Sequence, residues 1–279
     1  MNRRDFLAGA ATGVASAGVI GIAGRSLLSR PPDGQPAPAA PKAAPVPDPA
    51  APPKAAAPAA NQYKGRVSFA QQGEDLILYN LLHHAMGIEA PSYIDIGAGD
   101  PVLSNNTYAL YLTGSRGVLV EPNPTLVEAL KTVRPGDVVV NAGVGVKDSS
   151  AADYYVIRDQ WPLNTFSPDD VAVIRKRYKE DPVEKVIKMP LIQINRLLAE
   201  HFTTAPDLMS IDIEGLDLAV LRSMDFTAHR PAAICAETKK PWESHESSGI
   251  AKLLRARGYV ACAGSLYNTI FADRKRFLM

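Results

Sequence analysis

The chain has 279 residues, with 30 Lys and Arg against 29 Asp and Glu and a net charge of +1. From Asn61 onward, 24 basic residues face 26 acidic ones, so this part lacks the positive charge expected of a nucleic-acid-binding protein. The two cysteines, Cys235 and Cys262, provide no disulfide framework or zinc site, and both lie in apolar runs typical of small buried side chains.

Residues 1–30 have the composition of an export signal. Arg3 and Arg4 form a twin-arginine start, and the 19 residues from Phe6 to Gly24 carry no charge. They include six Ala and five Gly, so they are less apolar than the run of about 20 residues that spans a bilayer as a helix. We predict a twin-arginine-type signal that is either cleaved or kept as a membrane anchor. A disordered or amphipathic leader is the alternative.

Residues 31–62 are predicted to form a linker. Between Pro31 and Ala60 there are eleven Pro and twelve Ala but only four charged residues. Such a segment buries no core and forms no continuous helix, so we expect a semi-extended tether that reaches at most about 90 Å. Signal and linker together predict a protein that meets the export machinery and is exported or anchored on the non-cytoplasmic side. A cytoplasmic protein is the alternative.

Residues 63–279 have ordinary globular composition and a length that fits one domain. Helical and strand-like apolar patterns alternate along it. Helices are expected at 72–85, 106–112, 125–133, 168–178, 192–201, 216–223 and 247–257, and strands at 92–96, 117–121, 138–143, 153–157, 186–189, 208–213, 232–237, 259–263 and 269–272. This alternation predicts an α/β domain with a doubly wound, mainly parallel sheet, and the last two strands predict a C-terminal antiparallel hairpin.

The ends of two predicted strands carry a pattern typical of sites that bind nucleotide-like ligands. The first apolar run ends in Asp95-Ile96-Gly97-Ala98-Gly99, where a buried strand breaks into a glycine turn that lets backbone approach a ligand. The next strand ends at Glu121, whose carboxylate suits a ribose diol at the edge of an open sheet. The dinucleotide fingerprint needs a third glycine, which residues 100–107 lack. There is also no basic cluster for a pyrophosphate, so the pattern favours S-adenosylmethionine (SAM) over NAD.

Four segments occur together in this sequence: Ser68–Asp75, Tyr93–Thr107, Glu121–Pro124 and Ser210–Asp217. With these segments, residues 67–273 resemble the FkbM family of SAM-dependent methyltransferases. The resemblance implies a Rossmann-like, class I methyltransferase fold with SAM as the cofactor. It also implies methylation of hydroxyl groups on sugars, polyketides and other natural products, without fixing the acceptor.

Several residues are candidates for the cofactor site. The loop of Gly97, Ala98 and Gly99 is expected to pass beneath the methionine part of SAM, although an ordinary tight turn would need the same glycines. Asp95 would orient that loop or accept a hydrogen bond from the ligand amino group. Glu121 would accept both ribose hydroxyls in a bidentate arrangement. The remaining candidates for this site are Asn105, Thr107 and Asn123.

The catalytic candidates follow the two later strands. Asp212 and Glu214 share one face of a strand end, because side chains alternate there. They would act as base on the acceptor hydroxyl, bind a divalent metal, or cap the helix that begins near Gly215; no metal-binding motif accompanies them. Glu237 would position the acceptor or assist proton removal, or form a salt bridge to a neighbouring Lys. His245 is the histidine expected nearest the cleft.

The sequence therefore predicts a SAM-dependent O-methyltransferase that acts on a sugar or glycan hydroxyl. A second hypothesis is an exported, non-catalytic module that binds a glycan or another ligand on a methyltransferase fold. It arises because SAM is made in the cytoplasm, whereas the leader predicts passage across the membrane. Fold resemblance alone does not establish activity.

Overall fold

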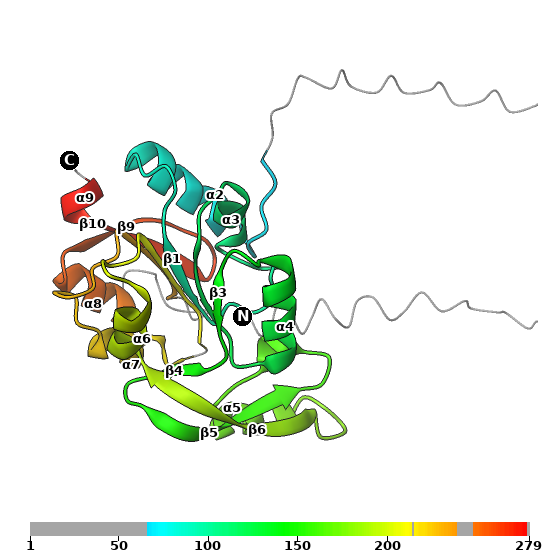
Figure 1. Cartoon of the computed structure of the whole chain (residues 1–279). Coiled ribbons are helices and arrows are strands. Elements are labelled where there is room, and N and C mark those ends of the chain that lie inside the picture. The colour runs from blue at the N-terminus through cyan, green and yellow to red at the C-terminus, as the bar shows by residue number, and fades with distance from the viewer. Residues whose placement is uncertain (1–65, 214, 239–247, 278–279) are drawn as a thin grey trace, which may run out of the picture. The chain divides into compact units, whose positions relative to one another are not determined.

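The computed structural model describes residues 66–213, 215–238 and 248–277, and those from Val67 onward belong to one compact unit (Figure 1). The expected signal and linker lie outside these ranges and stay predictions. Within the described ranges, no helix combines the length and apolar character needed to cross a bilayer.

The core of the unit is a seven-stranded sheet with the order β3-β2-β1-β7-β8-β10-β9. β10 pairs antiparallel with β8 and with β9, and the other neighbouring strands are parallel. The bounds are β1 Tyr93–Ile96, β2 Gly117–Val120, β3 Val138–Val140, β7 Leu208–Ile211, β8 Ala233–Glu237, β9 Tyr259–Gly264 and β10 Asn268–Asp273. The predicted mainly parallel sheet with a C-terminal antiparallel hairpin is confirmed.

Helices cover both faces of this sheet, because alternate strand side chains point to opposite faces. Ile94 and Ile96 pack in one apolar cluster with side chains of α6, α7 and α8, whereas Tyr93 and Leu119 pack in a second cluster with side chains of α2, α3 and α4. The bounds are α2 Glu74–Tyr79, the π-helical η1 Asn80–Ala85, α3 Tyr108–Leu112, α4 Pro124–Val133, α6 Ile194–His201, α7 Asp217–Ser223, α8 Gly249–Ala256 and α9 Arg274–Phe277. The sheet is therefore doubly wound, as predicted.

The register of three adjacent parallel strands brings their ends to one edge of the sheet. Ile96 of β1 is aligned with Val120 of β2 and with Ile211 of β7. The residues that follow these three positions therefore leave the sheet side by side: Gly97, Glu121 and Asp212. This edge is where ligands bind in open α/β sheets.

A second sheet is inserted between β3 and α6, and the sequence analysis did not foresee it (Figure 1). This inserted sheet has the order β4-β6-β5 and consists of β4 Gly143–Gly145, β5 Ser149–Ile157 and β6 Val183–Gln193, with the 3-10 helix η2 Trp161–Leu163 and the helix α5 Pro168–Arg175 between β5 and β6. The strand expected over 138–143 is present as β3 but ends at Val140, and Gly143 begins β4 of the inserted sheet. The Asn141 amide donates to the carbonyl oxygens of Glu121 and Pro122, so the chain turns out of the main sheet after Val140.

A buried arginine links β1, the end of α4 and the loop that follows Gly99. Arg134 lies just after α4 and is fully buried. Its guanidinium nitrogens donate to four oxygens, those of Asp137 (2.8 Å), the Tyr93 hydroxyl (2.9 Å), Thr107 (3.0 Å) and Asn105 (3.1 Å). The Asp137 side chain is buried too and forms an ion pair with Arg134. All four hydrogen-bond partners of the Arg134 guanidinium are therefore polar side chains.

Replacing this arginine with an apolar side chain of similar length should destabilise the fold. Arg134→Met leaves the Asp137 carboxylate buried without its counter-charge, and such losses typically cost about 3–5 kcal/mol. Urea or guanidinium unfolding followed by circular dichroism measures the change. The double variant Arg134→Met, Asp137→Asn removes the unpaired charge and should recover part of the loss. A double variant less stable than the single one would contradict this account.

Candidate functional site

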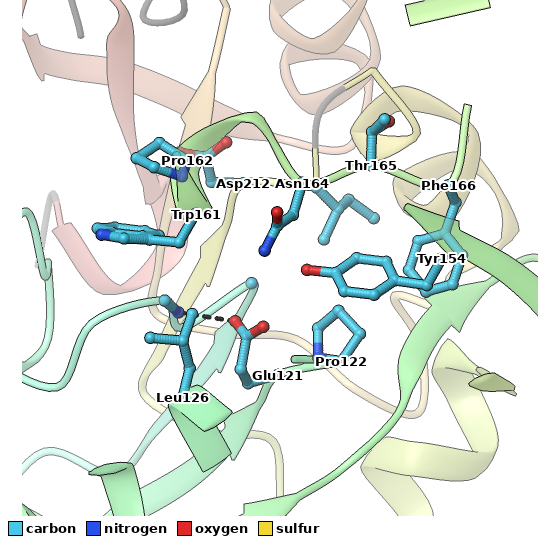
Figure 2. Close-up of a pocket in the computed structure, with 13 residues that line it drawn as sticks. Glu121, Pro122, Leu126, Tyr154, Trp161, Pro162, Asn164, Thr165, Phe166 and Asp212 are labelled. Carbon is cyan, nitrogen blue, oxygen red and sulfur yellow. Dashed lines mark hydrogen bonds between the residues drawn. The ribbon is translucent and has the colours of Figure 1, made fainter. Parts of the chain in front are cut away.

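A pocket lies between the carboxyl edge of the main sheet and the inserted sheet (Figure 2). It contains about 560 Å³ of empty space, part of it open to solvent. The loops that follow β1, β2 and β7 and the helix α4 line it with Gly97, Gly99, Glu121, Pro122, Leu126, Asp212 and Ile213. The segment from β5 to the start of α5 lines it with Tyr154, Trp161, Pro162, Asn164, Thr165 and Phe166.

The glycine loop is shaped by close backbone contacts. Gly97 and Gly99 have φ values of 82° and 63°, in the left-handed region that disfavours other residues. A Cβ on Gly97 would lie 2.1 Å from the backbone oxygen of Asp212, and a Cβ on Gly99 would lie 2.7 Å from the Trp161 ring. The two glycines are therefore required where the loop packs against Asp212 and Trp161. Both also line the pocket, so the loop presents backbone to the space where SAM is expected.

Glu121 stands at the wall of the pocket as the first residue after β2, and it is only 4% exposed. Its two carboxylate oxygens accept hydrogen bonds from the backbone N–H groups of Gly99 (2.9 Å) and Asn123 (2.7 Å). Burial raises the pKa of Glu121 to about 7; the two backbone bonds oppose this rise, and the Asp95 carboxylate adds to it. Each oxygen keeps a lone pair for another donor, so these bonds are compatible with the predicted binding of a ribose diol.

Three other predicted cofactor residues, Asp95, Asn105 and Thr107, are not among the residues that line the pocket. Asp95 accepts from the Thr107 hydroxyl (2.8 Å), and the Asn105 amide donates to the backbone oxygens of Ala98 and Asp100. Burial raises the pKa of Asp95, and the Arg134 guanidinium opposes that rise. These contacts hold the glycine loop, so any contact of Asp95, Asn105 and Thr107 with the cofactor stays a prediction.

Asn123 has a structural contact of its own. Its side chain accepts from the Thr125 N–H (3.0 Å) and caps α4, with Pro124 at the first helical position. Like Ala98, it is not among the residues that line the pocket. Its backbone N–H orients Glu121, as described above.

Of the four catalytic candidates, the structure places Asp212 in the pocket wall. The turn before α7 is held by Asp217, whose carboxylate accepts from the N–H groups of Ile213 (3.2 Å) and Gly215 (3.1 Å). Glu237 is half-buried at the end of β8 and is not among the lining residues. Glu214 and His245 lie outside the described residues. In the described part of the chain, no group of three or more His, Cys, Asp or Glu side chains is arranged to hold a metal ion.

The sequence analysis missed the wall that the inserted sheet provides. Figure 2 shows the Tyr154 hydroxyl and the Asn164 amide facing the same space as the Glu121 carboxylate. Trp161 lies against Gly99, and Phe166 packs on the Tyr154 ring with 4.8 Å between ring centroids. The one available signal was the pair of large aromatic residues, Trp161 and Phe166, in a segment expected to be irregular.

Comparison with known families gives one result for this chain. The sequence model described as "Methyltransferase FkbM domain" matches residues 95–261, which is more than half of the chain. The match includes the glycine loop, Glu121, the inserted sheet and Asp212. No protein with curated annotation matches the sequence significantly.

Solved structures with a similar arrangement share little sequence with this chain. Monomeric WbdD has 10% identity and a TM-score of 0.37 over 72% of this chain and 40% of its own. An O-methyltransferase from Bacillus cereus in complex with SAH has 13% identity and a TM-score of 0.37 over 76% and 84%. A TehB-like SAM-dependent methyltransferase from Corynebacterium glutamicum has 12% identity and a TM-score of 0.37 over 73% and 88%. Similarities this distant add no argument about the activity of this chain.

SAM binding should strengthen as the pH rises through the pKa of Glu121. The ionised carboxylate can accept from both ribose hydroxyls, whereas the protonated group has lost acceptor capacity on one oxygen. With a pKa of about 7, the ionised fraction grows from about a tenth at pH 6 to about nine tenths at pH 8, so the affinity should rise roughly tenfold. Isothermal titration calorimetry across this range measures it.

Glu121→Gln is the control for this titration. Glutamine keeps the shape of the side chain and one acceptor oxygen but cannot ionise. The variant should bind SAM more weakly, and its affinity should lack the tenfold rise. An equal rise in both proteins would assign the pH dependence to another group.

Proposed function

Because this chain belongs to the FkbM methyltransferase family, whose members use SAM, we propose that it methylates a hydroxyl group of a sugar or glycan. The observation that carries the proposal is one pocket that joins the glycine loop and Glu121 to Asp212 and an aromatic wall. The glycine loop and Glu121 fit the cofactor. Asp212 and the aromatic wall would face an acceptor that presents hydroxyl groups beside it.

SAM supplies a methyl group bound to a positively charged sulfur. The chain has to place the acceptor oxygen in line with that carbon, and positioning of this kind accounts for about 7–11 kcal/mol of a barrier. We assign to Asp212 the task of holding the acceptor hydroxyl and taking its proton. A base contributes most when the acceptor is an alcohol of high pKa. Glu214, Glu237 and His245 remain further candidates for this task.

Asp212→Asn should slow methyl transfer without preventing SAM binding. The amide keeps the size of the side chain but cannot take a proton, and loss of a general base typically lowers kcat by roughly 10²–10⁴-fold. Transfer of a labelled methyl group to methyl glycosides of hexoses, deoxyhexoses and uronic acids measures kcat. Calorimetry measures SAM affinity in parallel.

Asp225→Asn is the matched control, because Asp225 is exposed and its carboxylate accepts hydrogen bonds from Thr227 and Ala228 in its own turn. It should leave transfer unchanged. Full activity of Asp212→Asn would remove Asp212 from the role of base. Methylation of amines or thiols with none of the sugars accepted would overturn the proposed acceptor class.

We further propose that residues 1–30 either direct the protein out of the cytoplasm or anchor it in the membrane on the non-cytoplasmic side, with the linker as a spacer. The support is the composition of the leader: Arg3 and Arg4 followed by 19 uncharged residues rich in Gly and Ala. The twin-arginine pathway exports folded proteins, so a SAM-loaded molecule could leave the cytoplasm intact. The non-catalytic binding module remains the second hypothesis for an exported protein that holds no SAM.

Replacing Arg3 and Arg4 with Lys should retain the protein in the cytoplasm, because the twin-arginine pair is the recognition element of such signals. Cell fractionation with an immunoblot of wild type and variant measures the distribution. A wild-type protein found in the soluble cytoplasmic fraction, and unchanged by the substitution, would contradict an export signal.

A further inference from the structure

Asn164 presents an unusual polar group to the pocket. Asn164 is 8% exposed, and its side-chain oxygen accepts from the Ile157 N–H at 2.8 Å. This bond fixes the amide orientation, because only the oxygen can accept, and it turns the NH2 group toward the pocket (Figure 2). That nitrogen lies near the Tyr154 hydroxyl but forms no hydrogen bond of good geometry with the described residues. A buried donor in this state is costly, so its position suits a ligand acceptor.

Tyr154 presents a second polar group beside it. The side chain is 4% exposed, and its ring packs against Phe166 within the apolar cluster of the inserted sheet. The hydroxyl faces Asn164 and Glu121 across the pocket (Figure 2). Burial raises the pKa of Tyr154, and the Glu121 carboxylate raises it further while Asn164 lowers it. The hydroxyl is therefore protonated and can donate.

The three groups are complementary to a pair of adjacent hydroxyls. An ionised Glu121 only accepts, whereas Asn164 through its NH2 group only donates, and Tyr154 does either. A vicinal diol between them would donate both protons to Glu121 and accept at its oxygens from the opposite wall. Glu121 alone would leave those oxygens without donors.

We propose that Tyr154 and Asn164 form the second half of the ribose site, so that the inserted sheet binds the ribose hydroxyls of SAM from the side opposite Glu121. This inference rests on the proposed function. The acceptor sugar could offer the same diol chemistry, but Glu121 directly follows β2 and contacts the glycine loop through Gly99. The nucleoside of the cofactor is therefore the source that the geometry favours.

The test uses binding of S-adenosylhomocysteine (SAH), without an acceptor, by calorimetry. Asn164→Asp keeps the oxygen that accepts from Ile157 but replaces the donor with an acceptor, and it should weaken SAH binding roughly tenfold or more. Tyr154→Phe removes only the hydroxyl and introduces no charge near Glu121, and it should weaken binding by about three- to tenfold. Tyr259→Phe is the matched control, since its buried hydroxyl bonds to the Pro231 carbonyl away from the pocket; it should bind SAH as wild type does.

Ligand analogues locate the contact. If Asn164 or Tyr154 binds a ribose hydroxyl, then 2′-deoxy- or 3′-deoxy-SAH should bind the corresponding variant as well as it binds the wild type, because the interaction is already absent. Variants that bind SAH normally, or that lose the same factor with SAH and with both analogues, would overturn the inference. A raised KM for the sugar with unchanged SAH affinity would assign the two residues to the acceptor instead. A wild-type protein that binds no SAH would refute the proposed function itself.

Discussion

The buried guanidinium of Arg134 connects β1 of the main sheet, through Tyr93, to the glycine loop, through Asn105. It donates to Asn105, and Asn105 in turn donates to the carbonyl of Ala98 within the glycine loop. A buried charge is tolerated only when its partners are all in place. A change of the loop that moved Asn105 would therefore remove one of the four acceptors of the arginine. The glycine loop is thus linked through Asn105 to the buried core.

Much of the fold was predictable because it depends on local periodicity. The strands of the main sheet are short apolar runs, and the helices on its faces have apolar residues at helical spacing, so 208–213 and 216–223 were placed within a few residues. The expected strand 138–143 ends earlier, at Val140, for a reason that is not local. The Asn141 side chain bonds to the carbonyls of Glu121 and Pro122, and these contacts decide where the chain leaves the sheet.

The candidate site likewise contains some residues that the sequence predicted and others that it did not. Gly97 and Gly99 lie two positions apart, and Glu121 ends the adjacent strand, so a motif and the topology rule bring them together. Tyr154 and Asn164 come from a segment with no repeat or motif. Their position depends on how β5 pairs with β6, which pattern analysis cannot determine. One predicted role of Asp212 and Glu214 was to cap the helix that begins near Gly215. In the structure, Asp217 accepts from the backbone N–H groups of the turn before α7.

The elevated pKa of Glu121 has a thermodynamic consequence for the way this protein takes up its cofactor. With a pKa of about 7, about half of the ligand-free molecules at neutral pH carry a proton on this carboxyl. A ligand that selects the ionised form expels that proton into the buffer. The heat of association then includes the ionisation enthalpy of the buffer, so it should differ between phosphate and Tris even when the affinity is the same. In a cell, cofactor loading would release protons on average, and local acidification would favour unloading.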